Sequence, residues 1–315
     1  SLSGQENNFT VNVAPSQTTT YTATVSGSNP NCPGIADVTV FVNAADAYFT
    51  GLDPSYCEDG TPVVLTGNYS GGVFSGSGMS GNNFDPGSLS PGTYNITYSY
   101  DYSVVTAFSD DFDPWPDASW IHGANYGSSS WEHDTPLGGN GQNNNSYSNP
   151  DPVTDHSSNT DNKVWGQGLS DSDGDGVGGH YDSSDEWLRS PAIDCSSLSN
   201  TVLSFWRFAN FETSWDEAYV QISTDGSSFT DLSSEPLYPQ DDEWTQRIIN
   251  ISSVADGEPT VYIRFRSISD NLQTYSGWNI DDFAITGVQA GGSCTSTDIQ
   301  STLVEALPSV NAGSN

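Results

Sequence analysis

The residues best suited to chemistry form an acidic loop, DSDGDG, that starts at Asp171. Its first, third and fifth positions are Asp171, Asp173 and Asp175, its sixth is glycine, and its twelfth is Asp182. Alternate carboxylates with a glycine at the sixth position wrap a hard cation. The twelfth ligand is usually a bidentate Glu, so the shorter Asp would bind less tightly. The pattern predicts a Ca²⁺ site, with a solvated Asp/Gly turn as the alternative.

Aromatic side chains in polar stretches are a second source of binding chemistry. All nine tryptophans lie between Trp115 and Trp278. Most tryptophans of a large β-sandwich belong to its core, but one in polar surroundings can offer a face on which a sugar ring stacks. The candidates for such a ligand-binding platform are Trp115, Trp120, Trp131 and Trp244.

Two arginines, Arg264 and Arg266, alternate with Ile263 and Phe265. This alternation is typical of a strand with one buried face. The arginines either bind an anionic ligand or pair with surplus acids on the exposed face, and we favour the pairing.

The common enzyme motifs are absent from the sequence. It contains no HExxH, no GxSxG and no Walker loop. The histidines fit no metalloprotease or deaminase spacing, and the GxGxxG match that starts at Gly76 has no βαβ context. We therefore expect a protein that is not an enzyme.

Composition limits the possible partners. Asp and Glu number 40 against six Lys and Arg, which gives a formal charge of −34. Such a surface repels nucleic acid and anionic lipid, so neither is expected as a partner, and it attracts divalent cations. The 31 glycines and 17 prolines, without a long helical period, indicate an all-β chain.

The chain has two composition regimes. All six basic residues and all nine tryptophans lie within residues 115–278, and the flanks contain neither. The flanks contain repeats instead. Residues 18–44 include TTTYTATV, a cysteine and IADVTVFVNA, whereas GTYNITYSY at 92–100 meets its matching second half only at 294–306, CTSTDIQSTLVEA. This pattern predicts a β-sandwich repeat that is split by an inserted domain.

The expected domains follow from this split. Residues 1–43 are the C-terminal part of one Ig-like repeat, 44–106 and 289–308 form the split Ig-like repeat, 107–288 form the insert, and 309–315 start a further repeat. Further repeats of the same chain are then expected on both sides. No apolar run approaches the length of a bilayer, so we expect no membrane span in this segment.

None of the four cysteines forms a CxxC pair, which disfavours a zinc or redox site. Cys57 opens the repeat that Cys294 closes, so we predict a Cys57–Cys294 disulfide at the base of the insert. A Cys32–Cys57 bridge is the competing pairing; without it, the partner of Cys32 lies upstream of residue 1. Cys195 is expected to be a small buried hydrophobe. A disulfide implies an oxidising compartment and hence export.

The order of segments in the insert is FSDDFD, WGQG, YDSSDEWLRSPAIDCSSL, DEAYVQISTDGSSF, VYIRFRS and GWNIDDFAITG. This order resembles the MAM-like jelly-roll modules of secreted bacterial proteins, including accessory domains of exported metalloproteases. The flanking sequence VFSGSGMSGNNFDPGSLSPGTYNITY resembles the Ig-like repeats of giant surface adhesins exported by gliding Bacteroidetes-type bacteria. The resemblance implies Ig-like sandwiches with an inserted jelly roll, and a role in adhesion or surface motility.

A similarity to calcium-stapled jelly rolls implies a second Ca²⁺ site. Asp111 lies in the first strand of the insert and Asp282 in the last, and these strands are commonly neighbours in such modules. The resemblance therefore makes Asp111 and Asp282 candidate ligands, with ordinary strand-end acids as the alternative.

Together these features predict a segment of a large secreted cell-surface adhesin. An Ig-like stalk would display a calcium-stabilised jelly roll that binds a glycan or a protein of an extracellular surface. The alternatives are a non-catalytic accessory region of a secreted hydrolase and a carbohydrate-binding module. Many neighbouring repeats in the same gene would favour the adhesin, and an upstream HExxH domain would favour the hydrolase.

Overall fold

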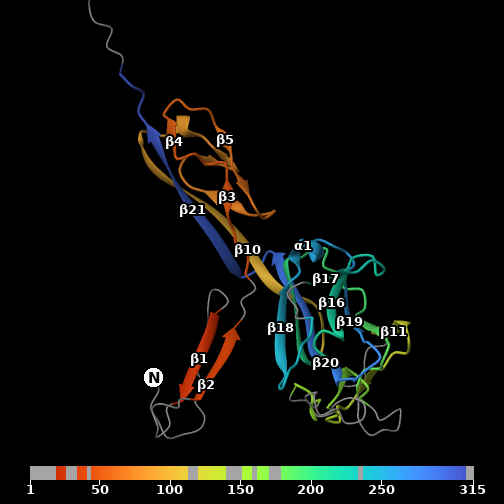
Figure 1. The fold of residues 1–315 in the computed structure, drawn as a ribbon. Coiled ribbons are helices and arrows are strands. Elements are labelled where there is room, and N and C mark those ends of the chain that lie inside the picture. The colour runs from red at the N-terminus through yellow and green to blue at the C-terminus, as the bar shows by residue number, and fades with distance from the viewer. Residues whose placement is uncertain are drawn as a thin grey trace, which may run out of the picture. The chain divides into compact units, whose positions relative to one another are not determined.

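The computed structural model describes residues 19–25, 34–40, 44–112, 120–139, 151–157, 162–169, 179–232 and 237–309. The regular structure of these residues is nearly all strand (Figure 1). Their helical elements are α1 (Ser252–Ala255) and the 3-10 helix η1 (Pro86–Ser88). The predicted all-β class is confirmed.

The chain folds as two compact units. Unit 1 is Ser1–Val104 together with Val288–Asn315, and unit 2 is Val105–Gly287. Unit 2 is thus one continuous stretch that interrupts unit 1. Each unit has its own cluster of buried hydrophobic side chains.

The strands of unit 1 are short, apart from two. They are β1 (Thr19–Val25), β2 (Gly34–Val40), β3 (Phe49–Thr50), β4 (Ser55–Cys57), β5 (Val63–Val64), β6 (Thr66–Gly67), β7 (Val73–Ser75), β8 (Met79–Ser80), β9 (Asn83–Phe84), β10 (Gly92–Asp110) and β21 (Cys294–Glu305). β10 begins in unit 1 and ends in unit 2. β21 pairs antiparallel with β10 and parallel with β4, so the C-terminal segment completes a sheet that starts more than two hundred residues earlier.

The core of unit 1 forms around Tyr98 of β10. Its ring lies 4.8 Å from Phe74, and its hydroxyl donates a hydrogen bond of 2.7 Å to the carbonyl of Tyr69. A Cβ atom at Gly67 or Gly72 would lie 2.2 or 2.1 Å from the Tyr98 side chain. Only glycine fits at these two positions, because the backbone passes directly against the ring.

The predicted Cys57–Cys294 disulfide is wrong. Cys57 lies opposite Glu305 in the pairing of β4 with β21, whereas Cys294 lies opposite Tyr102 at the other end of β21. At about 3.3 Å per residue, the strand from Cys294 to Glu305 spans about 36 Å, while a disulfide needs Cα atoms within about 7 Å. Both cysteines are free and exposed. The competing bridge involves Cys32, which lies outside the described residues.

Unit 2 is a sandwich of two sheets. Its strands are the end of β10 with β11 (Ile121–Tyr126), β12 (Trp131–Asp134), β13 (Val164–Gln167), β14 (Asp185–Arg189), β15 (Ser199–Asn210), β16 (Glu217–Ser223), β17 (Thr230–Asp231), β18 (Thr245–Asn250), β19 (Tyr262–Ile268) and β20 (Gly277–Ala290). One sheet has the order β11-β14-β19-β16-β17. In the other, β20 lies beside β13, β10 and β15, with β12 next to β13 and β18 next to β15.

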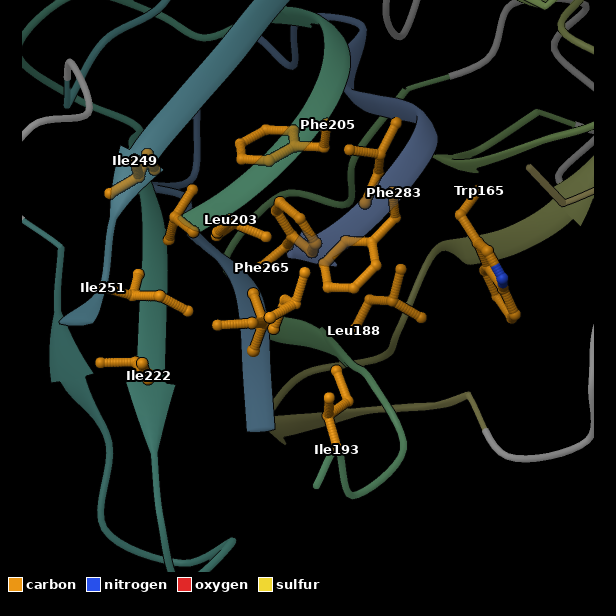
Figure 2. Packing of buried hydrophobic residues seen from close by; sticks show 14 of the residues in the cluster. Trp165, Leu188, Ile193, Leu203, Phe205, Ile222, Ile249, Ile251, Phe265 and Phe283 are labelled. Atoms are coloured by element: carbon orange, nitrogen blue, oxygen red, sulfur yellow. The ribbon is translucent and has the colours of Figure 1, made fainter. Parts of the chain in front are cut away.

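Side chains from both sheets meet in the core (Figure 2). Phe265 of β19 lies 5.0 Å from Phe205 of β15 and 6.5 Å from Phe283 of β20, in edge-on arrangements. Cys195 is buried in the same cluster, as predicted. The predicted fold class, a β-sandwich inserted into another β domain, is therefore confirmed.

Candidate ligand-binding site

β15 directs alternate side chains into the core and away from it. Leu203 and Phe205 are fully buried, whereas Trp206 is half-buried on the other face of the strand. Its partner across β18 is the exposed Gln246. Because successive side chains of a strand point to opposite faces, the alternation places this indole on the outer surface of the sheet.

The segment 151–157 is tied to this sheet through β20. Asp281 accepts hydrogen bonds from the backbone N–H groups of His156, at 2.8 Å, and Ser157, at 3.2 Å. Asp151 accepts one of 2.6 Å from the amide of Asn279. These contacts join residues more than a hundred positions apart and hold His156 above the sheet.

Three rings form what we call the His–Trp stack, which consists of Trp206, His156 and Trp244. The His156 imidazole lies on the Trp206 indole with 3.6 Å between ring centroids and 13° between planes. Trp244 stands at 6.3 Å from the imidazole and at 70° to it, and its Nε1 donates to the carbonyl of Thr154 at 3.1 Å. All three residues are half-buried, so the stack stays partly accessible.

Two consecutive acids hold His156 in place. Asp282 Oδ2 lies 2.6 Å from Nδ1 of His156, while Asp281 accepts the backbone N–H of the same residue. Asp282 has a φ of 47°, which few non-glycine residues adopt. This turn of the backbone lets both neighbouring carboxylates contact one residue, although their side chains would point to opposite faces of a regular strand.

Burial governs the electrostatics of this pair. Asp281 is fully buried, and burial followed by the charge of Asp282 raises the pKa of Asp281 to about 7, against the N–H donors that lower it. Asp282 is partly exposed. The site therefore presents one accessible carboxylate beside three accessible rings.

The structure separates the four tryptophan candidates. Trp244 belongs to the His–Trp stack, and Trp115 lies outside the described residues. Trp120 and Trp131 are not platform residues, because both are buried in the core of unit 2. Polar neighbours in sequence therefore did not indicate exposure: the Trp120 ring is buried, and its indole N–H donates to Asp110 at 2.9 Å.

The structure describes only some of the predicted Ca²⁺ ligands. Asp171, Asp173 and Asp175 lie outside the described residues. Asp282 contacts His156, and Asp111 is exposed near the end of β10. Within the described part of the chain, no three Asp, Glu, His or Cys side chains are arranged to hold a metal ion. Calcium stays a prediction.

Carboxylates do gather around Asp216, which is buried. Its Oδ1 accepts the N–H of Asp270 at 3.1 Å, and its Oδ2 lies 3.3 Å from Nε2 of His180. The pKa values of Asp182 and Glu212 are raised by burial and by the charges of Asp216 and Asp270. Since Ca²⁺ prefers oxygen ligands, this donor chemistry fits the predicted ion.

Sequence reasoning missed His156 and Trp206. Trp206 could have been found from the strand pattern LSFWRF, in which it alternates with Leu203 and Phe205. His156 had no local signal, because a contact with a residue 125 positions away fixes its place.

Comparisons with known proteins give distant structural similarities. The K1 cleaved adhesin domain of Lys-gingipain from Porphyromonas gingivalis W83 is 19% identical with a TM-score of 0.35, and the alignment covers 60% of this chain and 99% of that domain. The K3 cleaved adhesin domain of the same protein is 16% identical with a TM-score of 0.38, and the alignment covers 58% of this chain and 99% of that domain. A carbohydrate-binding module in complex with β-1,4-galactotriose is 11% identical with a TM-score of 0.33, and the alignment covers 56% of this chain and 89% of that module.

No family model matches this sequence, and no curated protein matches it. Similarities this distant define neither a family nor a ligand for the chain. Among the described residues, no helix has the length and apolar character needed to span a membrane.

Proposed function

We propose that this chain is a non-catalytic binding protein of a cell surface, and that unit 2 binds a saccharide at the His–Trp stack. The observation that supports this most is the stacking of Trp206 and His156 at 3.6 Å beside Trp244, on the outer surface of a sheet. Flat rings take the apolar faces of a sugar, and a nearby carboxylate, here Asp282, accepts hydrogen bonds from its hydroxyls.

The rigidity of the site also supports binding. Asp281 fixes the backbone of His156, Asp282 fixes its ring, and the Thr154 carbonyl fixes Trp244. A ligand that meets rings already held in place loses less entropy to ordering them.

A glycan array probed with the full chain tests this function. We expect binding to at least one class of glycan, and Trp244→Ala should weaken that binding about tenfold or more. Trp215→Ala is the matched control, because Trp215 is 63% exposed and outside the stack. If no glycan binds, or if both variants lose the same affinity, the His–Trp stack is not a saccharide site.

We further propose that unit 1 belongs to a stalk of similar repeats in a large secreted adhesin. The strongly acidic composition and the repeat pattern of the flanks support this, since charge keeps neighbouring stalks apart. The Cys57–Cys294 pairing no longer supports export, because the two thiols are far apart. Secretion of a tagged full-length gene product, tested by surface proteolysis of intact cells, distinguishes an adhesin from an intracellular protein.

Calcium binding is part of the same proposal. The loop from Asp171 to Asp182 would wrap the ion, and Asp216 and Asp270 place further negative charge close to Asp182. Burial, and then the charges of Asp216 and Asp270, raise the pKa of Asp182, and a bound cation would offset the repulsion between these carboxylates.

A further inference from the structure

Half of the basic residues of this acidic chain lie on one sheet face of unit 2. Arg189 of β14 is paired opposite Arg264 of β19, and Arg266 follows two residues later on the same face. Their neighbours Leu188, Ile263 and Phe265 point into the core. The three arginines therefore share the outer face of the β11-β14-β19-β16-β17 sheet.

Among the described residues, one of the three arginines has a carboxylate partner. Arg266 forms a two-pronged ion pair with Asp185, with both N–O distances at 2.7 Å. The predicted pairing of arginines with surplus acids thus holds for Arg266. Among the described residues, no carboxylate lies within ion-pair distance of Arg189 or Arg264.

Hydrogen bonds engage only some of the N–H groups of Arg189 and Arg264. Arg264 Nε donates to the side-chain oxygen of Gln221 at 2.7 Å, and Arg189 Nη1 donates to the Gly226 carbonyl at 3.2 Å. Arg189 Nε is buried and has no hydrogen-bond partner in the part of the chain that the structure describes. The nearby Asp231 is already engaged, because it accepts the Gln221 amide at 2.6 Å.

Aromatic rings flank both guanidinium groups. The Arg264 Cζ lies 3.9 Å from the centre of the Phe229 ring, and the Arg189 Cζ lies 5.0 Å from that of Tyr262. Ring contacts engage the flat face of a guanidinium and not its N–H edge. Because Nε is buried at Arg189 and bonded to Gln221 at Arg264, a ligand would meet the Nη groups. Burial, and then the charge of Arg266, lower the pKa of Arg264, so an added anion would relieve an unfavourable local charge.

We propose that Arg189 and Arg264 bind the carboxylate of an acidic saccharide, with Phe229 and Tyr262 beside the sugar ring. A guanidinium fork matches the two oxygens of a carboxylate, and adjacent aromatic rings suit a pyranose better than a bare acid. A ligand with isolated carboxylates fits this protein better than a dense polyanion, because the chain's charge of −34 repels the latter. This site lies on the other sheet from the His–Trp stack and does not depend on it.

Calorimetric titration of the full chain with sodium D-glucuronate tests the proposal, with D-glucose, sodium acetate and a tetraglutamate peptide as comparison ligands. We expect glucuronate to bind, glucose not to bind, and acetate and the peptide to bind at least about tenfold more weakly. Arg264→Gln should reduce glucuronate affinity about tenfold or more. Lys163→Gln is the matched control, since it removes one positive charge elsewhere, where Lys163 pairs with Asp134.

Several results would overturn the proposal. They are no glucuronate binding, acetate binding as tight as glucuronate, tighter binding of the peptide, or an equal loss in the Lys163→Gln control. Because Arg264→Gln could also disturb the contact with Phe229, Arg189→Lys provides a second variant that keeps the charge but lacks the fork. Undiminished binding by Arg189→Lys would exclude two-pronged recognition by that residue. In the unmodified protein, the arginine side-chain N–H resonances should shift with glucuronate and not with glucose.

Discussion

Units 1 and 2 are both built from antiparallel strands, but they are stabilised by different side chains. The described part of unit 1 buries tyrosines such as Tyr98 and Tyr100 and contains no Trp, Lys or Arg. Unit 2 contains every basic residue and every tryptophan, and it buries charged groups including Arg207, Asp216 and Asp281.

This difference indicates that the two units have different roles. Buried charge costs free energy unless each group has a partner, so it persists where it positions something. In unit 2, buried Asp281 positions His156, and buried Asp185 positions Arg266. The described part of unit 1 buries no Asp, Glu, Lys or Arg side chain, which suits a structural role.

The largest expected effect comes from the core of unit 2. Phe265→Ala removes a fully buried ring in contact with Phe205, Trp278 and Phe283, and should cost about 3–5 kcal/mol of unfolding free energy. Since the two clusters share no buried residue, scanning calorimetry should show the loss in one transition only. Ile96→Ala in unit 1 is the counterpart and should shift the other transition. Equal shifts of both transitions in either variant would mean that the units unfold as one.

Removal of calcium should have the next largest effect. A ligand at a hundredfold excess over its Kd stabilises the folded state by about 2.7 kcal/mol. Excess EDTA should therefore lower the melting temperature of unit 2 by several degrees and leave unit 1 unchanged. Asp182→Asn should abolish most of this response, whereas substitution of the exposed Asp59 of unit 1 should not. A melting curve of unit 2 that EDTA leaves unchanged would exclude a stabilising ion.

The stability of unit 2 should also depend on pH through Asp281. Its folded-state pKa of about 7 lies above the ordinary value of 3.8, so its stabilising contribution is fully present below about pH 4 and is lost as the pH rises through 7. In chelator, the free energy of unfolding should fall by at most about 1.4 kcal/mol per pH unit in this window.

Asp282→Asn sharpens the pH test, because it removes the neighbouring charge that helps to raise the pKa of Asp281. The fall in stability should then occur at lower pH. Asp194→Asn is the control, since Asp194 is exposed and its pKa is lowered by its bonds to Ser196. Denaturant titrations from pH 5 to 8 measure the effect, and a flat profile for the unmodified protein would contradict it.

The sequence predicted those features that depend on local pattern. Composition indicated the all-β class, and the alternation at 263–266 correctly placed Phe265 inside and Arg266 outside. Local pattern was misleading for Trp120 and Trp131, because polar residues next to a tryptophan in sequence need not surround it in space. It also could not reveal the His–Trp stack or its contact with Asp282, because residues 156, 206, 244 and 282 meet only through tertiary packing.

The smallest expected effect concerns the thiols of unit 1. Cys57 opens the repeat that Cys294 closes, which predicted a disulfide between them, but the two residues are far apart because β21 spans about 36 Å between their positions. Cys294→Ser should therefore change the unfolding free energy by less than about 0.5 kcal/mol, as expected of an exposed residue, even under oxidising conditions. Loss of a native disulfide would instead cost about 2–5 kcal/mol. Thermal melts of the variant and the unmodified chain, with and without reductant, separate these outcomes. A large loss seen only without reductant would show that Cys294 does have a disulfide partner, and that unit 1 relies on a covalent link where unit 2 relies on packing.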